Sequence, residues 1–251
     1  MLLVGSALEG YEIHASDGKI GTVSDLLFDD TTWKVRWIVV DVGTWLSGRK
    51  VLIHPSAIVE ADHRRQELAV RLTKAKVKDS PDILQDRPVS QQMESDLYSY
   101  YNWDPAWGAD YFAPSVMSSG AYFTDTMLRD PPGLGLRLSD GDPHLRSITT
   151  VKGYHVHATD GEIGHIENLL LDDANWHINY LIIDTKNWWF GKHVLVSPFA
   201  VRAIIWDEKE IQLDITRDRV KNSPPWDPLA AIDRAYEREL HGYYGWPGYG
   251  W

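Results

Sequence analysis

Short stretches of alternating apolar and polar residues begin near the start of the chain. Tyr11, Ile13 and Ala15 alternate with polar residues, which predicts a short half-buried strand. Residues 33–41 are mostly β-branched or aromatic, which predicts a longer strand that is buried on much of both faces. Further strands are predicted at residues 26–28, 50–54 and 66–72. The first eighty residues therefore read as a small all-β unit.

The period of the pattern changes after residue 72. Thr73 is a good N-cap for a short helix, which Pro81 cannot continue. A second helix is expected to begin near Pro88, because apolar residues follow it at helical spacings; they are Val89, Met93, Leu97 and Tyr100. Each unit is therefore predicted to be a small β-barrel with short C-terminal helices packed against it, since closure removes exposed strand edges.

The same pattern occurs twice. Gly10–Pro81 aligns without a gap on Gly153–Pro224, 143 residues later, and 26 of the 72 aligned positions are identical. The fold class predicted is mainly β with accessory helices, arranged as two tandem barrels related by a pseudo-two-fold axis. The expected boundaries are 1–103 for the first barrel, 104–147 for a linker and 148–251 for the second barrel. The linker is rich in Pro, Gly, Ser and aromatic residues, which favours a flexible connection or a functional loop.

Composition and charge exclude several classes of function. The chain has 251 residues, 43% of them hydrophobic, so it can bury a core and is not generally disordered. It has no cysteine, which excludes disulfides, a thiol nucleophile and thiolate metal sites. The net charge of −11, with no basic segment, argues against a nucleic-acid partner. No targeting or membrane-spanning segment is found, so the expected location is cytoplasmic, and peripheral membrane contact stays open.

Aspartates recur at the ends of the predicted strands. Paired carboxylates can bind Ca²⁺ or act as acid and base, but aspartates in turns also bond to their own backbone, and this structural role is favoured. The predicted turn residues are Asp17, Gly18, Asp29 and Asp30 in the first copy and Asp160, Gly161, Asp172 and Asp173 in the second. Asp41 and Asp184 end the longest strands and are expected to accept backbone hydrogen bonds from the loops that follow.

Histidines give a weak indication of a metal site. His155 and His157 lie two residues apart on one face of a predicted strand, so they are weak candidate ligands. In the first copy Glu12 takes the place of His155, and exposed strand histidines are therefore the favoured interpretation. No metal or other cofactor is predicted. No nucleophile motif or catalytic triad is recognisable in the sequence either, so the chain is not expected to be an enzyme.

Aromatic residues are the strongest functional signal. They occur in a predicted turn, where polar residues are usual, and directly after the second helix of each copy. Tryptophan and tyrosine are favoured at interface hot spots. The candidate partner-binding residues are Trp45, Trp188, Trp189, Tyr100, Tyr101, Trp103, Tyr243, Tyr244 and Trp246. The alternative is that these aromatics cover the open face of each barrel within the same molecule, and the sequence leaves both interpretations open.

Both copies carry one motif set: Asp-Gly-x-Ile-Gly, then Asp-Asp-x-x-Trp, then a strand that ends in Asp, and later Ser-Pro. Over residues 6–81 and 149–224 the chain resembles the PRC-barrel domain family. The resemblance implies a small β-barrel like those of the photosynthetic reaction-centre H subunit and a ribosome maturation factor. In both, the domain docks onto other macromolecules, and its motif contains no catalytic residues.

The resemblance and the repeat together predict a non-enzymatic docking or adaptor module. Its partner is expected to be a protein, and a homo-oligomer stays open. By the resemblance alone, the module would assemble or regulate a complex of the photosynthetic or electron-transfer type. The alternative is a ligand- or ion-binding stress-response protein with a site between the barrels.

Overall fold

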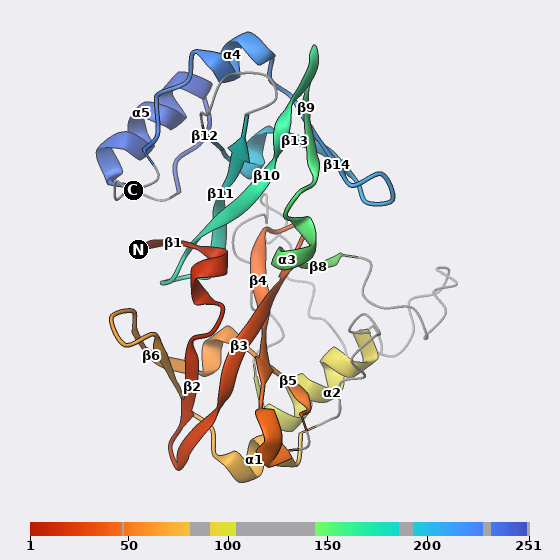
Figure 1. Cartoon of the computed structure of the whole chain (residues 1–251), viewed down its shortest axis with the longest axis vertical. Helices are drawn as coiled ribbons and strands as arrows, with labels where there is room; N and C mark the ends of the chain where they lie inside the picture. Colours follow the sequence, from red (N-terminus) through yellow and green to blue (C-terminus); the bar gives the residue numbers. More distant parts are fainter. Residues whose placement is uncertain (47, 81–90, 104–143, 186–192, 228–231, 250–251) are drawn as a thin grey trace, which may run out of the picture.

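Each of the seven strands described in the first half returns in the second half, starting 143 residues further along. The computed structural model describes residues 1–46, 48–80, 91–103, 144–185, 193–227 and 232–249. The two halves lie end to end along the long axis of the molecule (Figure 1). The prediction of a mainly β fold with short accessory helices, built as a tandem repeat, is confirmed.

The first half contains β1 (Leu2–Val4), β2 (Glu12–Ala15), β3 (Gly18–Asp29), β4 (Lys34–Asp41), β5 (Lys50–Ile53), β6 (Ile58–Asp62), β7 (Glu67–Val70), α1 (Lys74–Lys78) and α2 (Gln91–Tyr101). The second half contains β8 (Leu145–Ser147), α3 (Ile148–Val151), β9 (His155–Ala158), β10 (Gly161–Asp172), β11 (His177–Asp184), β12 (His193–Val196), β13 (Val201–Ile205), β14 (Glu210–Leu213), α4 (Arg217–Lys221) and α5 (Arg234–Tyr244). Four 3-10 turns are described, η1 (Gly5–Leu8), η2 (Gly43–Leu46), η3 (Pro55–Ala57) and η4 (Pro198–Ala200).

One continuous sheet runs through both halves. Its strand order is β13-β14-β9-β10-β11-β4-β3-β2-β7-β6, which is symmetric about the junction of β11 with β4. At this junction Val35 N donates to Trp176 O at 2.8 Å, and Ile178 N donates to Trp33 O at 2.7 Å. Backbone hydrogen bonds thus join the halves directly.

The halves also exchange their first strands. β1 pairs with β10 of the second half, and β8 pairs with β3 of the first half. Both exchanged strands cross the predicted domain boundaries: residues 2–4 belong to the second half's sheet, and residues 145–147 are a strand rather than the end of a linker. Each half is therefore completed by the other.

Two glycines are required where the long hairpin strands meet. A Cβ atom on Gly21 would lie 2.1 Å from the carbonyl oxygen of Asp41, and one on Gly164 would lie 2.0 Å from that of Asp184. Both positions adjoin register shifts in the pairing with β2 and β9, as expected for a bulge. No residue with a side chain fits there without moving the neighbouring backbone.

The helices cover the sheet much as the apolar spacing predicts. Thr73 and Thr216 cap α1 and α4, since their hydroxyl oxygens accept from the backbone N–H groups of Lys76 and Arg219. Leu97 of α2 is buried and so is Leu240 of α5, whose N-cap is Asp233. Val89, the first apolar position predicted for the helix that contains Leu97, lies outside the described residues. None of the described helices is long and apolar enough to cross a membrane.

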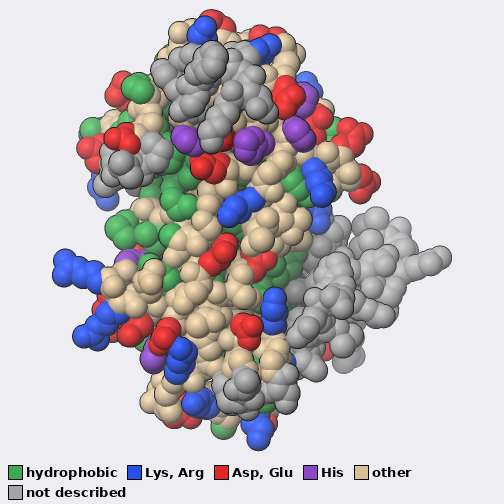
Figure 2. Space-filling view, viewed as in Figure 1, with side chains coloured by type: hydrophobic (Ala, Val, Ile, Leu, Met, Phe, Trp, Pro, Cys, Tyr) green, Lys and Arg blue, Asp and Glu red, His purple; other side chains and the backbone are tan. Residues whose placement is uncertain are grey.

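Charged side chains of both signs are interspersed over the face of the molecule shown in Figure 2. Among the described residues on this face, lysines and arginines form no continuous patch, in keeping with the acidic composition. Histidine side chains, in contrast, gather on the second half.

Candidate functional site

The aromatic residues after α2 and α5 fold back onto their own half. Tyr101 stacks on Trp103 with ring centroids 4.1 Å apart, and Tyr244 stacks on Trp246 at 4.0 Å. Tyr101 is 5% exposed and Tyr244 is 6% exposed. These two candidate partner-binding residues lie in the core of the protein, so a partner cannot reach them in this fold.

Hydrogen bonds hold the neighbouring tyrosines against the short helices. The hydroxyl of Tyr100 donates to the carbonyl oxygen of Lys76 at 3.0 Å, and that of Tyr243 donates to the carbonyl oxygen of Arg219 at 2.9 Å. The guanidinium of Arg219 in turn donates to the carbonyl oxygen of Tyr244 at 3.0 Å. These hydrogen bonds hold α2 against α1 and α5 against α4.

The side chains of the predicted partner-binding tryptophans of the turns lie outside the part of the chain that the structure describes. Trp188 and Trp189 lie outside the described residues, and the side chain of Trp45 is likewise not described. Trp103 and Trp246 are half-buried and pack on the core.

The predicted turn aspartates bond to backbone N–H groups. Asp29 accepts from Thr31 and Thr32 at 2.9 and 2.8 Å, and its pKa is lowered because these hydrogen bonds outweigh the effect of burial. Asp17 and Asp160, next to Gly18 and Gly161 of the hairpins, reach further than their own turns. They accept from the first N–H groups of α1 and α4, at Lys74 and Arg217, over 2.8 and 2.7 Å. They thereby anchor these helices to the hairpins.

The second aspartate of each Asp-Asp pair contacts the other half. Burial raises the pKa of Asp30, although His144 and Arg146 hydrogen-bond to its carboxylate at 2.9 and 3.1 Å. Asp173 is hydrogen-bonded to His63 at 3.0 Å and to the amino group of Met1. Burial alone would raise its pKa, but these two contacts outweigh burial and lower it. Asp172 also contacts Met1 N, at 3.2 Å.

Asp41, at the end of β4, accepts the backbone hydrogen bond that the sequence predicts. Its Oδ1 accepts from the backbone N–H of Gly43 at 2.8 Å, as predicted for the following loop. Asp184 at the end of β11 is buried, and His165 Nε2 lies 3.9 Å from its Oδ2.

A groove of about 610 Å³ lies at the junction of the halves. One wall is β13, from Val201 to Ile204, and the other is formed by β8 and by the turn between β3 and β4. Arg146 and Trp206 also line the groove, and the Arg146 guanidinium lies 3.9 Å from the ring centroid of Trp206. Of the residues that line this groove, the sequence pattern singles out Asp30 alone as a candidate, because the walls come from segments more than a hundred residues apart.

A buried polar cluster under α5 was also missed. The hydroxyl of Tyr180 is hydrogen-bonded to Glu237 Oε1 at 3.1 Å and to His241 Nε2 at 2.8 Å. Burial raises the pKa of Tyr180 and of Glu237, and it lowers the pKa of His241. In the first half, Trp37 and Tyr98 occupy the positions that correspond to Tyr180 and His241. This difference between the two copies is the feature of the sequence that could have revealed the cluster.

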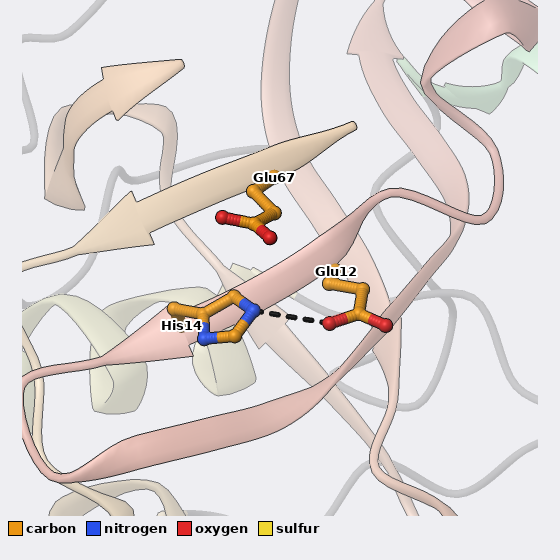
Figure 3. A group of neighbouring side chains, drawn as sticks. All are labelled: Glu12, His14 and Glu67. Atoms are coloured by element: carbon orange, nitrogen blue, oxygen red, sulfur yellow. Dashed lines mark hydrogen bonds and ion pairs between the residues drawn. The ribbon is translucent and has the colours of Figure 1, made fainter. Parts of the chain in front are cut away.

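Glu12, His14 and Glu67 meet on the surface of the first half, where β2 runs beside β7 (Figure 3). Each offers a ligand atom within 4.8 Å of the others. Glu12 already accepts from Lys19 at 2.7 Å and contacts His14 at 3.1 Å, and these hydrogen bonds lower its pKa. The group is therefore an exposed ion-pair network in this structure.

The weak metal candidates of the second half occupy the equivalent positions. His155 Nδ1 is hydrogen-bonded to Glu162 at 3.0 Å, and His157 Nε2 lies 3.6 Å from Glu210. The two imidazoles thus have separate carboxylate partners and do not share one.

Comparison with known proteins identifies the family. The PRC-barrel domain matches residues 5–71 and 143–220, one match in each half, so the chain belongs to the PRC-barrel domain family. An uncharacterized protein of Deinococcus radiodurans is 36% identical over 90 residues, which is 36% of this chain and 31% of that protein. The chain thus matches about a third of that relative's length.

Proposed function

We propose that the chain is a non-enzymatic docking module in which two fused PRC-barrel domains present one rigid surface to a protein partner. The observation that carries the proposal is the junction groove, which both halves build and neither half contains alone. Exchanged strands and the shared sheet fix the walls of the groove relative to each other. A preformed surface of this kind lowers the entropy lost on binding.

The groove suits an extended segment of a partner. Among the described residues β13 pairs on one side only, with β14, and its residues from Val201 to Ile204 line the groove. An extended peptide can add a strand to the edge of a sheet. Phe199, 36% exposed at the rim, supplies an apolar contact of the kind that anchors interfaces.

A non-enzymatic role agrees with the position of the acid–base groups. Tyr180 and His241, which form the hydrogen-bonded cluster under α5, are both buried and pack against aromatic rings. A substrate cannot reach either side chain. The role of the cluster in this proposal is therefore structural, and the groove is the proposed binding surface.

A photo-crosslinking amino acid at Arg202 tests the docking proposal. Arg202 lies on β13 in the groove, and Val59 occupies the equivalent exposed position of the first half, so it is the matched control. Irradiation in the native host should link one polypeptide to position 202 and not to position 59. Equal labelling at both positions, or none at position 202, would contradict docking at this groove.

Binding of a small ligand in the same groove is the second candidate function. The observation that favours it is the volume of about 610 Å³, bordered by His144, Asp30 and the stacked pair of Arg146 and Trp206. A ligand that binds the folded state raises the melting temperature by mass action. Titration with divalent metals and common metabolites should raise it, and Trp206→Ala should abolish the rise. Flat titrations would exclude this alternative.

A further inference from the structure

Glu12, His14 and Glu67 bring three potential metal ligands together on the surface of the first half. His14 lies two residues after Glu12 on β2, so both side chains point to the same face of the strand. Glu67 of β7 is paired directly with Glu12 across the parallel strands. One imidazole nitrogen and one oxygen of each carboxylate lie within 4.8 Å of one another, and Figure 3 shows the three side chains on neighbouring strands. The register of β2 with β7 therefore holds the group together.

The spacing of these atoms suits a small divalent cation. Zinc binds imidazole nitrogens and carboxylate oxygens at about 2.0–2.2 Å, so two ligand atoms of a tetrahedral zinc ion lie about 3.4 Å apart. His14 Nε2 lies 3.1 Å from Glu12 Oε2, which is close to that separation. The side chains of His14 and Glu12 are 36% and 41% exposed, so an ion can reach them from solvent and keep water as a further ligand.

The two carboxylates give the group an excess of negative charge. Like charges directly opposite each other on neighbouring strands are destabilising. Lys19 compensates for part of this charge, because its Nζ lies 2.7 Å from Glu12 Oε1. The contact with Lys19 uses Oε1, whereas His14 contacts Oε2 of the same carboxylate. A cation bound at Oε2 can therefore offset the remaining charge without displacing Lys19.

The second half carries ligand-type residues at the same three positions, His155, His157 and Glu210, although only 26 of the 72 aligned positions of the repeat are identical. There, however, His155 is hydrogen-bonded to Glu162 at 3.0 Å, and His157 lies 3.6 Å from Glu210. Glu162 takes the place of Lys19. The ligand atoms of the second half thus separate into two pairs. Among the described residues, the first-half group alone brings three ligand atoms within 4.8 Å of one another.

We propose that Glu12, His14 and Glu67 form a binding site for a divalent transition-metal ion of the zinc type. Three protein ligands with water in the remaining position are an arrangement that zinc adopts. The imidazole favours zinc, copper or nickel over magnesium and calcium. The ion links β2 to β7, and because it binds the folded state it stabilises the first half by mass action. None of the three residues lines the junction groove, so the site does not depend on the docking function.

Titration calorimetry with Zn²⁺ on the full chain tests the proposal. The wild type should bind one ion per chain, and Mg²⁺ and Ca²⁺ should give no heat. His14→Ala should weaken zinc binding by at least about 10-fold, since loss of even an outer hydrogen-bonding partner of a metal ligand costs about that much. His157→Ala is the matched control, because it removes the equivalent histidine of the second half, and Trp206→Ala is a control in the junction groove. Both controls should bind zinc as the wild type does.

Lys19→Glu gives a test in the opposite direction. It installs the residue that the second half has at the equivalent position, 162, so it preserves a sequence that this fold accepts. The substitution removes a cation that lies 2.7 Å from Glu12 Oε1 and should tighten zinc binding severalfold, because that cation repels the ion. A network of ion pairs without a metal site gains nothing from this change.

The contrary outcomes are distinct. A wild type that binds no zinc overturns the proposal, and so does equal zinc affinity in the wild type and His14→Ala. Loss of binding in His157→Ala assigns the ion to the second half, loss in Trp206→Ala assigns it to the junction groove, and either result overturns the proposal. Unchanged or weaker binding in Lys19→Glu does the same. Nitrogen-resolved NMR of the wild type needs no variant: zinc should shift the ring signals of His14 and not those of His157.

Discussion

Arg146 and Asp30 join the two halves of the molecule. The Nε of Arg146 in β8 donates to Oδ2 of Asp30, at the turn after β3, over 3.1 Å. The Asp30 side chain is only 8% exposed, so the pair is largely withdrawn from water. The equivalent aspartate, Asp173, meets His63 of the first half at 3.0 Å. Asp30 and Asp173, which the sequence assigns to turns, thus also connect the two halves.

Arg146→Ala should lower the free energy of unfolding by about 1–3 kcal/mol, because it leaves a nearly buried carboxylate with fewer partners. Urea denaturation measures the change. Arg202→Ala is the control: its side chain is exposed, and its loss should cost about 0.5 kcal/mol or less. Equal effects of the two variants would show that the contact between Arg146 and Asp30 adds nothing to stability.

Gly164→Ala should destabilise the protein by more than about 3 kcal/mol. Its Cβ would lie 2.0 Å from the backbone oxygen of Asp184, and the residue has a φ of +143°, which side chains disfavour. Gly153→Ala is the matched control. Gly153 also has a positive φ, +85°, but a Cβ there meets nothing within 4 Å, so its cost should be about 1 kcal/mol. Thermal unfolding of both variants separates the close contact from the backbone strain, and similar losses would refute the role given to the contact.

The repeat made most of the fold predictable, because two copies aligned on each other mark the positions that the strands and turns require. The exchange of β1 and β8 was not predictable. Each strand has three residues, too few for a pattern, and in a duplicated chain Leu2–Val4 matches the partner strand of either half equally well. Pairing within one half and pairing between halves therefore look the same in the sequence.

The candidate site was predictable only where its residues act locally. Asp29 bonds to the turn that it starts, as expected from its type and position. Asp30, by contrast, meets residues 114 and 116 positions away, and no local pattern encodes those contacts. In the aromatic tails, the role of each tyrosine depends on its burial. Tyr244 lies in the core, whereas its neighbour Tyr243 is half-buried.

Separate expression of residues 1–103 and 144–251 should give two chains that do not form stable monomers. Each lacks the strand that the other supplies, and each exposes the apolar edge of β3 or β10. Mixing the two should restore the fold, measured as a 1:1 complex by size-exclusion chromatography and as recovered β circular dichroism. Two well-folded monomers that ignore each other would show that the exchange is dispensable.

The buried cluster under α5 should make stability depend on pH in a defined direction. Burial lowers the pKa of His241 below its ordinary value of 6.5, so the unfolded chain takes up a proton there before the folded chain does. The stabilisation from neutral His241 is complete above pH 6.5 and is lost as the pH falls through its folded pKa. Glu237 acts in the opposite sense, because burial raises its pKa and the folded chain then binds the proton more tightly than the unfolded chain.

The contributions of His241 and Glu237 to the pH dependence of stability can therefore be measured separately, with variants in which a side chain that does not titrate replaces each residue. His241→Gln should flatten the fall in unfolding free energy between about pH 7.5 and 5.5 by up to roughly 1.4 kcal/mol per pH unit, and Glu237→Gln should steepen it. Urea denaturation at several pH values in this range measures both slopes. His177, also buried and with a lowered pKa, remains in both variants and supplies a common background. Identical slopes in the wild type and both variants would mean that the cluster does not exchange protons on unfolding in this range.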